Sequence, residues 1–401
     1  MPRTWTFHSA GQIRFGKGAA DQTGEIAARL GLRRVLVITD QGLIDKDIAA
    51  PALSSLGAAS VGIEVFAGGA PEPSLRLAER CIGEARGYGP DGIIGLGGGR
   101  NMDLAKIAAL VLTHGGSARD YVGEDRVPGP VLPLICIPTT AGTGSEVSAS
   151  AIVTDEENEI KLGILSNYLR PRAAIIDPQL TVSCPKKVTA DSGIDALTHA
   201  IEAYTAVDNE DFPLPEGERS MYQGAHPFGD CVAEKAIATI GANLALAVSQ
   251  PKNLDARKNM SLGAMLGGLA FSNVGVALVH ALEYPVGGAT HCSHGAGNGL
   301  LLPHVMRFNL PQRMPRFAQI ARLLGRDTAG MSQQQAAEEA IVAVESLNRA
   351  IGIPARLRDL GAREDQLPAF AEKAFGIKRM LRVNPRAATV EDLLGILRAA
   401  F

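Results

Sequence analysis

The chain has 401 residues, 46% of them hydrophobic and 20% charged, so it can bury a large core, and its length favours two domains over one. A formal net charge of -3 provides no basic field for nucleic acid. No run of about 18 or more apolar residues predicts a membrane helix. Five cysteines without a CxxC pair, and the lack of an apolar segment with a small-residue cleavage site, lead us to expect a cytoplasmic protein.

The first part of the chain alternates short apolar runs with helical patterns, which predicts a parallel sheet wrapped by helices. Two further apolar segments divided by a charged tetrad predict a hairpin over residues 151–165. The runs expected as parallel strands are residues 34–40, 60–66, 91–96, 131–138 and 172–177.

From residue 179 onward the pattern is helical almost without strands. We therefore expect an α/β domain over residues 1–178 and an all-helical domain over residues 179–401, with the boundary near Pro178. Residues 207–229 are rich in Pro, Gly and charge, which predicts a long surface loop. The clearest helical patterns cover residues 189–204, 233–248, 255–271 and 333–351.

Two polar loops follow buried strands. Gly97, Gly98 and Gly99 stand between an apolar run and a helix, where backbone N–H groups and the positive helix end suit a pyrophosphate. A glycine cluster is equally compatible with a tight structural turn. The second loop, residues 138–146, carries three threonines and a serine, and two such loops at strand ends favour a real ligand site.

Asp40 ends the run at residues 34–40. A carboxylate there can accept both ribose hydroxyls and repel a 2′-phosphate, which favours NAD over NADP. The alternative is that Asp40 is only a helix N-cap. Spacing alone does not separate the two interpretations.

A metal site is predicted by four polar residues in the second half of the chain. Asp195 and His199 are four positions apart and share one face of a predicted helix. His280 lies on a helix that we expect Pro285 to end, and His294 opens the next helical stretch. A lone histidine on an apolar helix is more often a core residue, so the hypothesis rests on the cluster. One carboxylate and three imidazoles suit Fe(II) or Zn(II).

Over nearly its full length the chain resembles the iron-containing (group III) alcohol dehydrogenase family. The resemblance is carried by motifs that occur together and in order: VITDQGL around Asp40, GGGRNMDLAK at 97–106, PTTAGTGSE at 138–146, GIDALTHAIEAY at 193–204 and HGAGNGLLLPHVMRFN at 294–309.

The resemblance implies a Rossmann-like dinucleotide-binding domain, an all-α domain, and an active site in a cleft between them. The implied metal ligands are Asp195, His199, His280 and His294, with Fe(II) expected first and Zn(II) as the alternative. NAD is the implied cofactor. Its implied contacts are Gly97, Gly98, Gly99, Asn101, Asp103, Thr139, Thr140, Thr143 and, at the ribose, Lys161.

The chain departs from the family pattern at three places. Arg100 stands where the family usually has serine, and residues 207–229 look longer than the corresponding loop. Tyr284 replaces a histidine that lies near the nicotinamide in many members. We therefore consider Tyr284 and His291 as candidate proton donors, although Tyr284 could instead cap its helix and His291 could be an outer residue of the site.

The expected reaction is the interconversion of an alcohol with its aldehyde or ketone: a metal polarises the substrate oxygen, and hydride passes to or from the nicotinamide. The expected partners are this small substrate and a second copy of the chain, as a homodimer. Alternatives on the same fold are glycerol-dehydrogenase-like polyol oxidation, dehydroquinate synthesis and hydroxyacid:oxoacid transhydrogenation. A non-catalytic assembly protein is a remote alternative.

Overall fold

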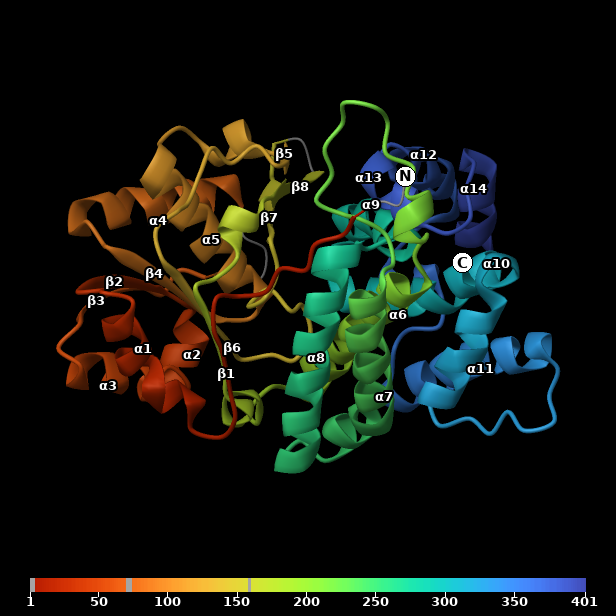
Figure 1. Cartoon of the computed structure of the whole chain (residues 1–401), viewed down its shortest axis with the longest axis horizontal. Helices are drawn as coiled ribbons and strands as arrows, with labels where there is room; N and C mark the ends of the chain where they lie inside the picture. The colour runs from red at the N-terminus through yellow and green to blue at the C-terminus, as the bar shows by residue number, and fades with distance from the viewer. Residues whose placement is uncertain (1–3, 70–73, 158–159) are drawn as a thin grey trace. The chain divides into compact units, whose positions relative to one another are not determined.

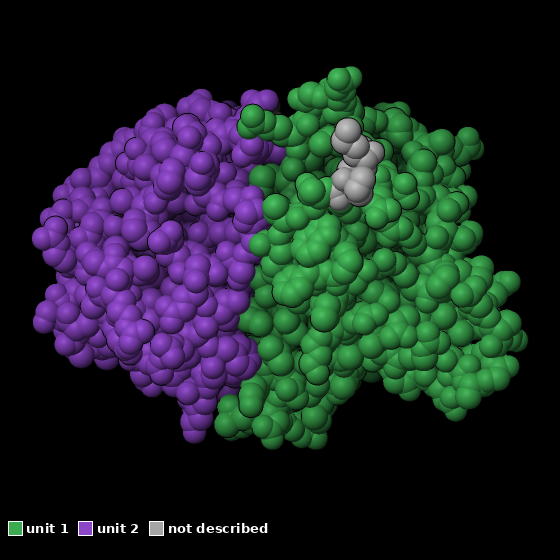
Figure 2. All heavy atoms as spheres, viewed as in Figure 1, with its two compact units in different colours: residues 1–7, 184–401 green, residues 8–183 purple. Residues whose placement is uncertain are grey.

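The computed structural model describes residues 4–69, 74–157 and 160–401. Its contacts divide the chain into two compact units (Figure 2). One is His8–Ser183, called here the α/β unit, and the other joins the described residues 4–7 to Cys184–Phe401, called here the helical unit. The division follows Ser183 and not Pro178, because Leu180 still packs in the core of the α/β unit.

The α/β unit contains a six-stranded sheet, in the order β1-β9-β6-β4-β2-β3, whose strands all pair in parallel (Figure 1). The five predicted strands are confirmed, whereas β1 was missed because it has three residues. The strands are β1 (Ile13–Phe15), β2 (Arg34–Ile38), β3 (Gly62–Phe66), β4 (Gly92–Gly97), β6 (Leu134–Pro138) and β9 (Ala173–Ile176).

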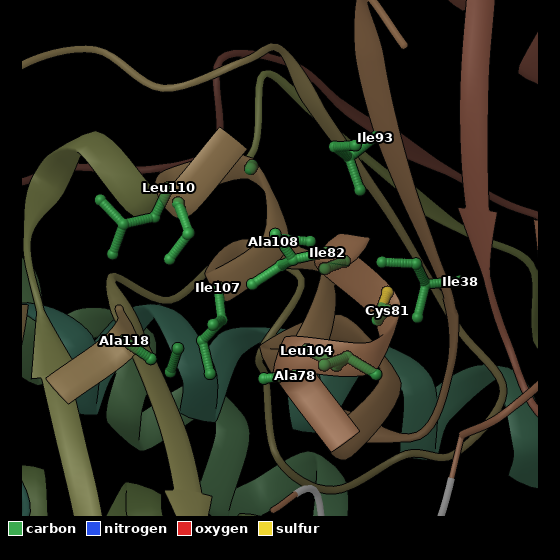
Figure 3. Packing of buried hydrophobic residues seen from close by; sticks show 14 of the residues in the cluster. Ile38, Ala78, Cys81, Ile82, Ile93, Leu104, Ile107, Ala108, Leu110 and Ala118 are labelled. Atoms are coloured by element: carbon green, nitrogen blue, oxygen red, sulfur yellow. The ribbon is translucent and has the colours of Figure 1, made fainter. Parts of the chain in front are cut away.

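Helices cover both faces of this sheet, so its central strands show no alternation of polar and apolar residues. Alternate residues of β2 enter opposite cores: Leu36 and Ile38 pack with α4 (Leu75–Tyr88) and α5 (Gly99–His114), as Figure 3 shows for Ile38. Val35 and Val37 pack on the other side with α1 (Thr23–Arg29) and α3 (Ala50–Ala58). The short helix α2 (Gln41–Asp45) follows β2.

A second sheet of three strands, in the order β5-β8-β7, lies in the same unit. Its strands β7 (Ser150–Asp155) and β8 (Ile160–Leu165) pair antiparallel, which confirms the predicted hairpin. Strand β5 (Gly123–Glu124) pairs with β8 in parallel.

The helical unit is built around α6 (Lys186–Thr205), which contacts α7 (Pro227–Ser249), α8 (Leu254–Val274) and α10 (His294–Leu323). Almost every residue of α6 from Thr189 onward is buried, as expected for a central helix. The other helices are α9 (Leu278–Thr290), α11 (Gln333–Ile351), α12 (Leu367–Phe375), α13 (Lys378–Val383) and α14 (Val390–Ala399).

The four predicted helices form, and α11 has the predicted bounds because a Ser332–Gln335 capping box starts it and a left-handed Gly352 ends it. The prediction that Pro285 ends its helix was wrong: α9 continues to Thr290. A proline inside a helix removes one backbone hydrogen bond, and the buried side of α9 compensates for that loss.

The predicted loop at residues 207–229 has one short 3-10 helix, Asn209–Asp211, before α7 begins. It is not simply a surface loop, because Phe212, Tyr222 and His226 are buried. Tyr222 packs at Gly275, where a side chain would lie 2.9 Å from the tyrosine ring.

Within the described residues, α7 has the length and composition of a membrane span, and α8 with α9 would pass only as one span bent by 103°. Core helices of ordinary globular proteins pass the same test. In α7, 33% of the apolar window is buried, including Ile237, Ile240 and Leu244, which pack within the helical unit.

Candidate active site

Asp195, His280 and His294 bring their ligand atoms together, all within 4.8 Å of one another. Asp195 Oδ1 lies 3.7 Å from His280 Nε2 and 3.8 Å from His294 Nε2. Asp195 and His280 are buried, and His294 is partly exposed. The structure thus gathers residues from α6, α9 and α10 that are up to about a hundred positions apart in the sequence.

His199, the fourth expected ligand, lies beside this group. Its Nε2 is 3.9 Å from Asp195 Oδ1, consistent with the shared helix face predicted from the four-residue spacing. The His199 ring stacks on His280, with centroids 4.8 Å apart, and on Phe271 at 4.3 Å.

Glycines explain how α10 can approach α6 closely enough to bring His294 to Asp195. A side chain at Gly295 would lie 1.9 Å from the Asp191 carbonyl oxygen, and one at Gly299 would lie 2.8 Å from Ile194. The motif HGAGNG therefore serves packing as well as chemistry, because the two backbones could not approach so closely with larger residues.

The electrostatics of the cluster suit a cation. Burial alone would raise the pKa of Asp195, but the surrounding His199, His294 and His280 hold it below its usual value. Burial would lower the pKa of His280, yet Glu202 raises it through its charge and its hydrogen bond. A carboxylate and imidazole nitrogens that face one point form the donor set that Fe(II) and Zn(II) accept. The residues therefore fit the expected metal.

Sequence reasoning missed three residues around the cluster. Glu202 Oε2 lies 2.6 Å from His280 Nδ1, Glu283 accepts from His294 Nδ1, and Asn298 Nδ2 donates to Asp195 Oδ1 at 2.8 Å. A signal was present, since each stands three or four positions after an expected ligand histidine, one helical turn away.

The two candidate proton donors are placed differently. The partly buried Tyr284 has its ring centroid 6.1 Å from that of His294. His291 is exposed at the left-handed C-cap of α9, and among the described residues no ring contact or side-chain hydrogen bond joins it to the cluster. The structure thus brings Tyr284, and not His291, next to an expected ligand.

In the α/β unit, the two predicted polar loops follow the carboxyl ends of the neighbouring strands β4 and β6. The chain reverses its winding direction between β2 and β4, the position where nucleotides bind in such sheets. The Thr139 N–H donates to the Gly97 carbonyl at 2.9 Å, and a side chain at Gly99 would lie 2.6 Å from Thr143. Helix α5 begins at Gly99 without a side-chain cap, and the positive end of a helix suits an anion. Thr140 lies near Gly98.

Three of the expected cofactor residues make contacts inside the unit. Asp40 caps α2 by accepting from the Leu43 N–H at 3.1 Å, and its other oxygen accepts from Asn101 Nδ2 at 3.1 Å. Asp103 accepts from the Ser145 hydroxyl at 2.7 Å and from a backbone N–H. Asn101 and Asp103 therefore brace the loops. Lys161 lies in β8, opposite Thr154 in the hairpin.

Comparison with known proteins identifies the family to which the chain is similar. The family described as iron-containing alcohol dehydrogenase matches residues 10–178, and the C-terminal part of the Fe-containing alcohol dehydrogenase family matches residues 218–401. The chain is 34% identical to the NAD-dependent methanol dehydrogenase of Bacillus methanolicus, over 96% of this chain and 97% of that protein. It is 38% identical to long-chain-alcohol dehydrogenase 1 of Geobacillus thermodenitrificans, over 96% and 94%.

A solved structure of 1,3-propanediol oxidoreductase superposes with a TM-score of 0.93 at 35% identity and covers 100% of both chains. This likeness extends over both units. It confirms the predicted combination of a parallel-sheet α/β domain and an all-helical domain.

Proposed function

The chain belongs to the iron-containing alcohol dehydrogenase family, and we propose that it interconverts an alcohol and its aldehyde or ketone with NAD, on a divalent ion held by Asp195, His199, His280 and His294. The observation that carries the proposal is the convergence of one carboxylate oxygen and imidazole nitrogens from separate helices. When bound, the ion supplies Lewis acidity toward the substrate oxygen, and NAD accepts or returns the hydride.

The residues of the chain would bind, orient and shield. Asp195 and the histidines would hold the ion, and Phe271, stacked on His199, would provide an apolar wall beside it. At the α/β unit, the N-terminus of α5 and the threonines of the second loop would hold the diphosphate, and Asp40 the ribose.

Reconstitution tests this function. Protein stripped with a chelator should be inactive with NAD and a panel of alcohols, and Fe(II) or Zn(II) should restore turnover. Comparison of the two ions identifies the preferred metal. Full activity after complete removal of metal would contradict the proposal. Oxidation of a hydroxyacid that requires an added oxoacid but no added NAD would instead indicate the transhydrogenase.

We further propose that the protein acts in the cytoplasm as a homodimer. All five cysteines are free, as expected in a reducing compartment. Strand β1 is an edge of the six-stranded sheet, and an edge strand can pair with another chain. Light scattering during size-exclusion chromatography tests the dimer, and a monomeric mass would contradict it.

A further inference from the structure

Two carboxylates with almost no exposed surface lie behind the expected metal ligands. The side chain of Glu202 is 4% exposed and that of Glu283 is 0% exposed. Glu202 Oε2 lies 2.6 Å from His280 Nδ1, and Glu283 Oε2 is hydrogen-bonded to His294 Nδ1. Burial of a carboxylate is unfavourable unless donors satisfy it, so each of these contacts stabilises a group that would otherwise destabilise the fold.

These contacts determine which nitrogen of each ring carries hydrogen. An ionised carboxylate can only accept, so His280 and His294 carry their hydrogen on Nδ1 and present the lone pair of Nε2. Those Nε2 atoms are the ones that lie 3.7 and 3.8 Å from Asp195 Oδ1. We propose that Glu202 and Glu283 are positioning residues that hold His280 and His294 in the tautomer and orientation needed to bind the metal.

This inference rests on the proposed metal site and adds two residues to it. Glu202 is fixed from a second side, because its Oε1 accepts from the Val279 N–H at 2.6 Å. It therefore links α6 to the first turn of α9, the turn that carries His280. Both of its oxygens are used, and a glutamine could not accept from both donors.

Glu283 is held by packing. It lies on α9 and reaches His294 on α10, and Gly297 leaves the room it needs. A side chain added at Gly297 would lie 2.8 Å from Glu283 Cγ. Substitution of Gly297 by alanine should therefore displace Glu283 without changing any charge or ligand.

The test measures Zn(II) binding by competition with a chelator in the full-length protein. Because loss of such a carboxylate partner typically weakens metal affinity by about 10- to 100-fold, we expect that range for Glu202→Gln and its lower end for Glu283→Gln. A smaller loss, of about threefold, is expected for Gly297→Ala. Glu234→Gln is the matched control, since Glu234 accepts from the Tyr204 hydroxyl and touches no ligand. It should bind Zn(II) like the wild type.

Nitrogen-15 NMR of histidine-labelled, metal-stripped protein provides a second readout. The wild type should show the Nδ1–H tautomer at His280 and His294, and Glu202→Gln, which has one acceptor oxygen for two donors, should lose it at His280. A merely structural role would not move this signal. If a glutamine variant does not fold, Gly297→Ala and the wild-type tautomers still decide the question.

The outcomes separate this inference from the proposed function. Wild-type Zn(II) affinity in Glu202→Gln and Glu283→Gln, with loss of binding in His280→Ala, would overturn the positioning role and leave the metal site intact. Retention of Zn(II) by His280→Ala would overturn the metal site itself. An Nε2–H tautomer at either histidine in the wild type would also contradict the inference.

Discussion

In the α/β unit the ammonium group of Lys106 is fully buried, and in the helical unit the carboxylate of Asp195 is buried among histidine rings. Lys106 is surrounded by complementary acceptors: its Nζ donates to Ser145 Oγ at 2.8 Å, Ser148 Oγ at 3.1 Å and the Ser150 carbonyl at 2.7 Å. Asp195 Oδ1 instead lies 3.7 Å from His280 Nε2 and 3.8 Å from His294 Nε2, so several acceptor atoms gather at one place.

Comparison of Lys106 with Asp195 shows how a buried charge with a structural role differs from one in a binding site. Both groups are charged and buried, so burial alone does not separate them. Lys106 uses its three N–H bonds inside the protein and ties α5 to the second loop and to β7. The helical cluster presents several acceptors to one point, which a cation satisfies. The gathering of several acceptor atoms, more than depth in the core, marks the candidate functional site.

The largest effect should follow from breaking the convergent cluster. We expect Asp195→Ala and His280→Ala to abolish activity by loss of metal while the protein stays folded, because three ligands hold a divalent ion poorly in a site built for four. Metal analysis and circular dichroism of the purified variants measure both quantities. His304→Ala, which changes a histidine of α10 outside the cluster, is the control. Full metal content and turnover in either variant would show that the ligand assignment is wrong.

The second prediction concerns Glu146, buried near Lys106. Burial raises the pKa of Glu146 from 4.5 to about 7. Between these values the folded protein binds more protons than the unfolded chain, so stability should fall as pH rises through this window and level off above it. Each unit of difference between the two pKa values corresponds to about 1.4 kcal/mol, so the free energy of unfolding should fall by roughly 3 kcal/mol across this window.

Glu146→Gln removes the charge, so it should remove this pH dependence. Thermal melting of the wild type and the variant measures this pH dependence. The pH should be varied between 5 and 8, and extended by about one unit at either end where needed. The variant should gain most relative to the wild type at the alkaline end. Parallel pH profiles for the two proteins would mean that Glu146 has an ordinary pKa and that its surroundings stabilise the buried carboxylate.

The third prediction concerns the role of Asp40 in cofactor choice. Asp40 caps α2, as the N-cap interpretation required, but a capping carboxylate can also repel a 2′-phosphate. Asp40→Asn keeps a capping oxygen and removes the charge. The NAD over NADP ratio of kcat/KM should fall at least about fivefold, since like charges 4 Å apart repel by about 1 kcal/mol even in water. An unchanged ratio, or better use of NADP by the wild type, would leave Asp40 as a cap and direct attention to Arg100.

Local patterns predicted the elements well, and tertiary contacts account for what they missed. Apolar runs predicted β2 and β4, and the helical pattern of residues 333–351 predicted α11, because these signals lie within a few positions of each other. The contact between Glu202 and His280 spans 78 positions. The helical and strand periods of a sequence carry no information about such a distant contact, which forms only when α6 and α9 pack together. Pro285 was misread for a related reason, since packing of α9 outweighs a local helix-breaking signal.

The last prediction concerns Tyr284, at the edge of the convergent cluster. Its ring centroid lies 6.1 Å from that of His294, and we propose that its hydroxyl donates or relays a proton. Tyr284→Phe keeps the ring and removes that function. Since a positioned acid or base contributes about 100-fold or more, kcat should fall at least about tenfold with metal content unchanged.

His291→Ala is the comparison variant, because His291 is exposed and outside the cluster. If Tyr284→Phe changes kcat by less than about threefold, Tyr284 only fills space and water completes the proton path. A larger loss in His291→Ala than in Tyr284→Phe would reverse the assignment, and would imply that the C-cap of α9 approaches the substrate during turnover.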